Sequence, residues 1–205
     1  FVERFYAEGK AAAKLNHPNI VGALDVGRNV DRHYFVMEYV DGKTVYDVIT
    51  DKGQYRETDA INVIIQIAEA LDHAHKAGLI HRDVKPKNVM ITKDGVAKLA
   101  DMGLARPVDD REAAEAEKGK AYGTPYFISP EQIRGLTDVD CRADIYSLGA
   151  TFYHMVTGQV PFEGSNPSEV MHKHLKKQIV PPDEINQSLT AGVCEIIEIC
   201  MAKDR

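Results

Sequence analysis

Cysteine, long apolar runs and basic clusters are all scarce in this sequence of 205 residues. Its three cysteines are too few, and odd in number, for a disulfide framework, and they suit a reducing compartment. No signal peptide is visible, and no run of about 18 apolar residues predicts a membrane span. Lysine and arginine are scattered, and the net charge of -6 argues against nucleic acid or an anionic membrane as the main partner. We therefore expect a soluble, cytoplasmic chain, with any membrane anchor lying outside it.

Hydrophobic residues make up 44% of the chain, which predicts a folded core rather than disorder. The first segment is rich in helix formers up to Leu15, and Pro18 ends the expected helix. Residues 19–27 and 33–40 have the composition of two strands and are expected to form a hairpin. Gly42 then interrupts the strand pattern, so the first part of the chain should contain one helix and one small sheet.

The rest of the sequence is mostly helical in pattern. A long helix is expected to begin with Thr58 as its cap and to end at Gly78. A second hairpin, over residues 89–101, should turn at Lys93-Asp94-Gly95. Three more helices are expected: one apolar on most sides and ending at Gly158, one beginning at Pro167, and one over residues 190–202.

The order of these elements predicts an α+β fold with two unequal lobes. Residues 1–40 form the smaller lobe in this prediction, and residues 41–205 form the larger one.

The stretch HRDVKPKN, from His81 to Asn88, carries an unusual set of polar groups for one short loop. Asp83 and Asn88 flank Lys85, and Asp101 comes directly after the next predicted hairpin. Amide and carboxylate oxygens from adjacent loops suit magnesium, and an amine between them neutralises phosphate. A second carboxylate, free of metal, can orient a hydroxyl and accept its proton. Phosphoryl transfer needs these parts, because its barrier is lowered by positioning and by charge neutralisation.

This loop resembles the catalytic loop of the eukaryotic-type Ser/Thr protein kinases, most closely those of the bacterial branch. Other matching segments follow in the family's order: HPNIV (17–21), VMEYVDG (36–42), DMG (101–103), GTPYFISPE (123–131) and DIYSLG (144–149). Lys85, two positions after Asp83, is the form typical of Ser/Thr rather than tyrosine kinases. The resemblance covers essentially the whole chain and implies a bilobal, protein-kinase-like fold, with a mostly α-helical C-lobe and a partial N-lobe of one helix and two strands. It also implies ATP and Mg²⁺ as cofactors, and protein substrates with Ser or Thr acceptors.

The resemblance implies a role for each matching polar residue of the two loops. Asp83 would be the catalytic base, and Lys85 would contact the γ-phosphate of ATP. Asn88 and Asp101 would bind Mg²⁺. Thr124 would brace Asp83 and Lys85 beside the acceptor hydroxyl. The alternative, that Asp83, Asn88 and Asp101 are only turn formers, is opposed by their joint spacing.

The resemblance also implies a nucleotide site between the lobes. Glu8 would pair with the ATP-binding lysine of the family, and Met37 would be the gatekeeper. Glu38 and Val40 would offer backbone groups to adenine, and Met90 would form the floor of the pocket. Taken alone, Glu8 would be an exposed helix residue, and Met37 and Met90 would be ordinary core residues.

Five further residues would hold such a site together. His81 would pack beneath the metal loop, and Met102 would fill an apolar gap that the family usually fills with phenylalanine. Glu131 would anchor the end of the activation segment. Asp144 would accept hydrogen bonds from the catalytic-loop backbone, although a carboxylate is also favourable at any helix N-terminus. Arg82 occupies the position that pairs with a phosphorylated residue in many kinases.

Three features depart from the family pattern. No glycine-rich strand–turn–strand and no ATP-binding lysine precede Glu8, so we expect an N-terminally truncated kinase domain that by itself binds ATP poorly and transfers negligible phosphate. Residues 104–123 contain acidic residues but no serine or threonine. Their order is therefore expected not to depend on their own Ser/Thr phosphorylation; either a carboxylate meets Arg82 or the segment is a flexible acidic loop. Lys87 stands where kinases that prefer basic substrates often carry glutamate, so no basic requirement is expected there.

Two other functions fit parts of this pattern. A pseudokinase scaffold without the ATP lid would bind partners without catalysis, and a lysine on a strand upstream of Phe1 would count against it. A small-molecule phosphotransferase of related fold shares a His-x-Asp-x₄-Asn loop, but the peptide-docking ledge expected of residues 123–131 opposes that reading. We therefore predict a protein Ser/Thr kinase.

Overall fold

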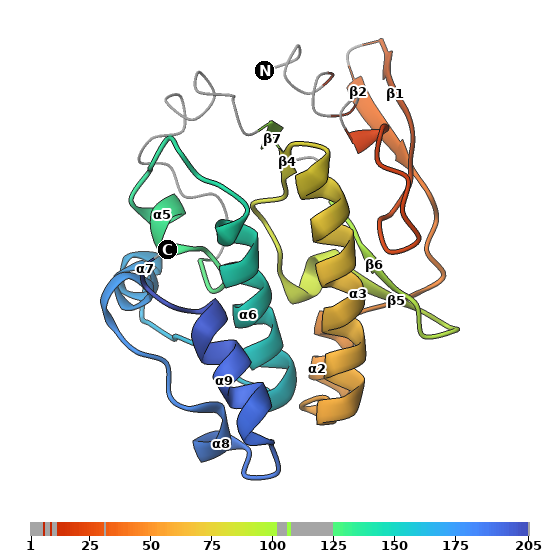
Figure 1. Cartoon of the computed structure of the whole chain (residues 1–205). Coiled ribbons are helices and arrows are strands. Elements are labelled where there is room, and N and C mark those ends of the chain that lie inside the picture. Colours follow the sequence, from red (N-terminus) through yellow and green to blue (C-terminus); the bar gives the residue numbers. More distant parts are fainter. Residues whose placement is uncertain are drawn as a thin grey trace.

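A computed structural model describes Tyr6, Gly9 and residues 12–30, 32–101, 106–107 and 125–204 (Figure 1). The strands within these residues are β1 (Ala23–Asn29), β2 (Arg32–Met37), β3 (Gly42–Thr44), β4 (Leu79–Ile80), β5 (Val89–Thr92), β6 (Ala97–Leu99) and β7 (Arg106–Pro107). The helices are α2 (Val45–Lys52), α3 (Glu57–Lys76), α5 (Pro130–Ile133), α6 (Arg142–Thr157), α7 (Pro167–Lys176), α8 (Pro182–Ile185) and α9 (Ala191–Cys200), with a 3₁₀ helix η1 (Pro86–Asn88). None of these helices combines the length and hydropathy that a membrane span requires. The predicted α+β class is confirmed.

The predicted first hairpin is confirmed as β1 and β2, which pair antiparallel at one end of the molecule (Figure 1). β1 begins at Ala23 rather than at residue 19, because residues 19–21 hydrogen-bond to Leu99 of another sheet. Before the hairpin, Tyr6, Gly9 and Ala12 are helical, in line with the helix predicted up to Leu15. The small lobe is thus a helical segment beside a two-stranded sheet.

Strand β6, which leads to Asp101, is held on both of its edges. On one edge it pairs antiparallel with β5, which in turn pairs with β3, so the predicted second hairpin is confirmed. On the other edge residues 19–21 run parallel to it. The N–H of Leu99 donates to the carbonyl of Asn19 (2.8 Å), and the N–H of Val21 donates to the carbonyl of Leu99 (2.9 Å). The segment that enters the first hairpin is therefore anchored directly to the strand that precedes Asp101.

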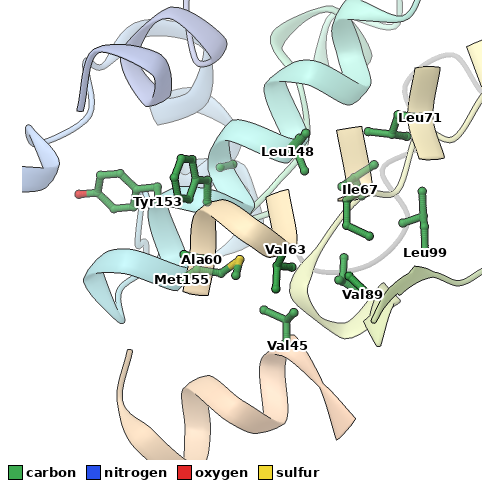
Figure 2. Close-up of a cluster of buried hydrophobic side chains, with 14 of the residues drawn as sticks. Val45, Ala60, Val63, Ile67, Leu71, Val89, Leu99, Leu148, Tyr153 and Met155 are labelled. Atoms are coloured by element: carbon green, nitrogen blue, oxygen red, sulfur yellow. The ribbon is translucent and has the colours of Figure 1, made fainter. Parts of the chain in front are cut away.

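Helices α3, α6 and α9 lie side by side and form the helical body (Figure 1). Helix α6 is buried along nearly all of its length, as its apolar pattern predicts. Its Gly149 lies so close to α9 that a Cβ there would be 2.5 Å from the Cβ of Cys200. Figure 2 shows the core between α2, α3, α6 and the β5–β6 hairpin, with the buried residues Val45, Ala60, Val63, Ile67, Leu71, Val89, Leu99, Leu148, Tyr153 and Met155. Each large apolar side chain buried here contributes about 1.5–3 kcal/mol, so this cluster is the main source of stability.

The helix ends agree with the sequence pattern except at the start of α3. Helix α6 ends at Gly158, whose φ of 71° favours glycine, and α7 begins at Pro167 after an Asn166 cap, both as predicted. The prediction that Thr58 caps α3 is wrong, because Thr58 lies inside the first turn, and the N-cap residue, Arg56, makes no side-chain cap bond. The neighbouring Glu57 instead turns its carboxylate toward the start of α9.

Glu57 caps a helix that is distant in sequence. Its Oε2 accepts from the N–H of Thr190 (2.7 Å), and its Oε1 accepts from the Thr190 hydroxyl (2.9 Å). Thr190 is the N-cap residue of α9, and its own hydroxyl does not cap the helix. Glu57 thus supplies the acceptor for a backbone N–H at the start of α9, and the contact ties α3 to α9.

Candidate active site

The loop after β4 is fixed by one buried carboxylate, Asp144 in the first turn of α6. Its Oδ2 accepts from the N–H of His81 (2.8 Å), and its Oδ1 accepts from the N–H of Arg82 (2.7 Å). The side chain of Asp144 is fully buried, and Arg82 has a φ of 68°, a left-handed conformation that is unfavourable for arginine. These hydrogen bonds hold the backbone immediately before Asp83 in a conformation it would not adopt alone.

Asp144 has a third hydrogen-bond partner, which was not predicted from the sequence. The Nε2 of His75, near the end of α3, lies 2.7 Å from Asp144 Oδ2. Because a carboxylate has no proton to give at neutral pH, the imidazole is the donor in this bond. His75 and Asp144 are 69 positions apart, so no local pattern indicates the contact. The carboxylate thus receives donors from both α3 and the loop.

Three side chains of the HRDVKPKN loop converge. The Nζ of Lys85 lies 2.5 Å from Asp83 Oδ2, and both side chains are partly exposed. The Nδ2 of Asn88 donates to Asp83 Oδ2 (3.0 Å) and to the carbonyl of Asp83 (2.9 Å). Since the amide nitrogen of Asn88 faces Asp83, its amide oxygen faces away from Asp83 and is of the hard kind that Mg²⁺ prefers. The loop therefore presents a carboxylate, an amine and an amide oxygen within one turn of chain.

Asp101 is brought to this loop by the residue before it. The N–H of Ala100 donates to the carbonyl of Asn88 (2.8 Å), and His81 Nε2 lies 3.0 Å from the carbonyl of Ala100. His81 is fully buried beneath this junction. Asp101 itself is exposed and has a φ of 63°. An amide oxygen and a carboxylate on two joined loops fit the hard-oxygen preference of Mg²⁺, which keeps several waters and shares phosphate ligands.

The residues expected around a nucleotide base lie where β2 ends. The side chain of Met37, at that end, is 47% exposed, whereas Val40 is buried. The N–H of Glu38 is occupied by the carbonyl of Gly22 (2.8 Å), so what Glu38 can offer a base is its carbonyl oxygen. Met90 lies on β5, where it is partly buried and pairs across the hairpin with Lys98.

An ion pair between Glu38, directly after β2, and Lys98 of β6 was not predicted from the sequence. The carboxylate of Glu38 accepts from the N–H of Gly22 (3.0 Å) and meets Lys98 Nζ at 2.8 Å through Oε1 and 3.1 Å through Oε2. The hydrogen bonds from Lys98 and from the Gly22 N–H lower the pKa of Glu38 below its usual value, so the carboxylate is ionised at neutral pH.

Helix α5 docks on the catalytic loop through a residue that was also missed. Gln132 Nε2 donates to the carbonyl of Arg82 (2.9 Å), while the Gln132 side chain and Ser129 form a capping box at the start of the helix. Glu131 is buried, with 4% of its surface exposed, in the same short helix. Helix α5 is thus hydrogen-bonded, through Gln132, to Arg82, the residue that precedes Asp83.

Three of the expected site residues, Glu8, Met102 and Thr124, lie outside the residues that the structure describes. The same holds for most of the acidic segment 104–123, so a carboxylate partner for Arg82 within it stays a prediction. The structure brings Asp83, Lys85, Asn88 and Asp101 together on the loops after β4 and β6. Met37, Glu38 and Val40 follow one another at the end of β2, and Met90 is linked to them through Lys98, its cross-strand partner, which pairs with Glu38.

Comparison with known proteins agrees with this arrangement. The family model described as "Protein kinase domain" matches residues 2–205. A protein of Clostridium perfringens named "Probable serine/threonine-protein kinase" is 45% identical over 203 residues, which cover 99% of this chain and 29% of that protein. The "Serine/threonine-protein kinase PknB" of Mycolicibacterium smegmatis is 39% identical over 208 residues, and that of Mycobacterium tuberculosis is 38% identical; each match covers 100% of this chain and 33% of the relative.

The chain spans about a third of the length of these curated relatives. All of them are bacterial, as the resemblance in the motifs predicts. A family match over nearly every residue means that this chain belongs to the protein kinase family, and the relatives it is similar to are bacterial proteins named as Ser/Thr kinases.

Proposed function

We propose that the protein containing this chain is a Ser/Thr protein kinase that transfers the γ-phosphate of ATP to Ser or Thr hydroxyls of other proteins. The observation that carries the proposal is the convergence of Asp83, Lys85 and Asn88 on one loop, with Asp101 joined to it through Ala100. The relatives are named as Ser/Thr kinases, which supports the same activity.

Each of these side chains has a task that its chemistry suits. Asp83 orients the acceptor hydroxyl and takes its proton, since its carboxylate is held by two donors and is partly open to solvent. Lys85 lies beside it and balances negative charge on the transferred group. Asn88 and Asp101 would hold Mg²⁺, which neutralises phosphate charge when bound. The backbone of Glu38 and the side chain of Met90 would contact the adenine.

The alternative of a scaffold without catalysis is not favoured, because the residues for acid–base work and metal binding are present together. For partners we propose ATP and protein substrates, and neither nucleic acid nor a membrane in contact with this segment, which carries a net charge of -6. We also propose a cytoplasmic location and a division into an N-lobe of residues 1–40 and a C-lobe of residues 41–205.

The test is the variant Asp83→Asn in the protein at its full natural length. Transfer of radiolabelled γ-phosphate to the protein itself and to Ser/Thr peptides should fall by at least about 10²-fold, because the general base is lost. The melting temperature should be nearly unchanged, since Asn keeps the shape of the side chain. Asp94→Asn, at an exposed turn, is the matched control and should be neutral. Full activity of Asp83→Asn would refute the proposed role.

A further inference from the structure

The ion pair between Glu38 and Lys98 lies at the inner edge of the proposed nucleotide site. Glu38 directly follows β2, and Lys98 is the middle residue of β6, three positions before Asp101. Lys98 meets both carboxylate oxygens of Glu38, at 2.8 and 3.1 Å. The Gly22 N–H adds a third donor to the same carboxylate at 3.0 Å. The contact therefore joins the end of the small sheet to the strand that carries the metal-binding aspartate.

Burial distinguishes this ion pair from an ordinary surface pair. The side chain of Lys98 is 16% exposed and that of Glu38 is 35% exposed. The same β5–β6 hairpin makes a second ion pair to the inter-lobe segment, between Lys93 and Asp41, but there the side chains are 74% and 59% exposed. A half-buried charge that loses its partner is left poorly solvated, whereas an exposed one is rescued by water. The two pairs thus form a natural comparison on one hairpin.

The register of the sheet places Lys98 beside the expected floor of the nucleotide pocket. Lys98 is the cross-strand partner of Met90, so the two side chains project to the same face of the β5–β6 hairpin. Glu38 follows Met37 at the end of β2, and its N–H is held by the carbonyl of Gly22. The ion pair therefore links the residue whose backbone would contact the base to the strand position directly opposite Met90.

From this geometry we infer that Lys98 is a positioning residue for nucleotide binding: its ion pair with Glu38 sets the separation between the base-contacting backbone of Glu38 and the floor at Met90. The inference rests on the proposed function. It assigns to Lys98 and to the Glu38 carboxylate a role in the affinity for nucleotide, not in the phosphoryl-transfer step. A merely structural pair would instead affect stability and turnover together.

The experiment compares Lys98→Met with Lys93→Met in the protein at its full natural length. Affinity for ADP is measured by calorimetry, and the KM for ATP, the KM for a peptide acceptor and kcat are measured separately. Lys98→Met should weaken ADP binding and raise the KM for ATP by about fivefold to tenfold, with the peptide KM and kcat within about twofold of the unsubstituted protein. Lys93→Met should leave all four values unchanged.

Two further variants test the charge itself. Lys98→Arg keeps the cation and should retain nucleotide affinity. The exchange Glu38→Lys with Lys98→Glu restores the ion pair but not the acceptor for the Gly22 N–H, so it should recover part of the affinity that each single change loses. If Lys98→Met does not fold, Glu38→Gln decides, because it keeps the acceptor for Gly22 and removes only the charge. A loss of stability and kcat with unchanged ADP affinity overturns the inference, and so does a loss that Lys93→Met shares.

Failure of this inference can be told apart from failure of the proposed function. If the unsubstituted protein binds ADP and transfers phosphate in an Asp83-dependent manner, while Lys98→Met binds ADP equally well, only the inference is wrong. If the unsubstituted protein binds no nucleotide at all, both are wrong.

Discussion

Replacing Asp144 with asparagine should weaken both the fold and the catalytic loop. The carboxylate receives three donors: the N–H of His81 and Nε2 of His75 at one oxygen, and the N–H of Arg82 at the other. Asparagine offers only one oxygen, and its NH₂ group must face a donor whichever way the amide is turned. At least one buried N–H is therefore left without an acceptor.

The magnitude follows from that count. One buried, unsatisfied donor costs about 1–3 kcal/mol, and the bonds that remain lose roughly half their strength when the acceptor is no longer charged. The sum is about 3 kcal/mol, which for a chain of this size corresponds to a fall in melting temperature of about 6–12 °C. The left-handed backbone of Arg82 (φ 68°) would also be free to relax, which displaces Asp83 and should cost about 10²-fold in turnover.

The assay is thermal unfolding by circular dichroism, with phosphate transfer measured on the same variant in the protein at its full natural length. Asp72→Asn is the matched control, because Asp72 is an exposed residue of α3 that pairs only with Lys76 among the described residues, and it should shift the melting temperature by less than about 2 °C. An Asp144→Asn protein that melts and turns over like the unsubstituted one would show that the carboxylate is not what holds the loop.

Two further predictions concern stability. Glu57→Ala removes both acceptors from Thr190 at the start of α9 and should lower the free energy of unfolding by about 1 kcal/mol in urea titrations; Glu69→Ala, at an exposed position of α3, should not, and equal effects would contradict the capping role. Burial, with a contribution from Lys203, lowers the pKa of His174 to about 4, so the folded state resists a proton that the unfolded chain takes up below pH 6.5. Stability should therefore fall by up to about 3 kcal/mol as the pH drops from 6.5 to 4, and His174→Gln should flatten that slope in urea titrations at pH 7, 6, 5 and 4; an unchanged slope would exclude His174 as its source.

The parts of the molecule that could be predicted are those that depend on residues close together in the sequence. The hairpin that turns at Lys93-Asp94-Gly95 and the helix stop at Gly158 follow from local backbone preferences. The catalytic loop likewise keeps Asp83, Lys85 and Asn88 within a few positions, so their convergence requires little beyond one tight turn.

The contacts that could not be predicted all span long separations. His75 reaches Asp144 across 69 positions, Lys98 reaches Glu38 across 60, and Gln132 reaches Arg82 across 50. Each depends on how helices and strands pack, which hydrophobic periodicity indicates only by face and not by partner. The prediction that Thr58 caps α3 was also wrong. The capping contact at this point is made by its neighbour Glu57, and it serves the distant helix α9.

The pairing of β6 on both of its edges, with β5 and with residues 19–21, has a mechanical consequence. Residues 19–21 are a short tether between the small sheet and Leu99, two positions before Asp101. A movement of the small sheet that keeps these main-chain hydrogen bonds must also move Asp101. A larger movement must first break the bonds. The position of the small sheet and the position of Asp101 are therefore mechanically coupled through the bonds of residues 19–21 to Leu99.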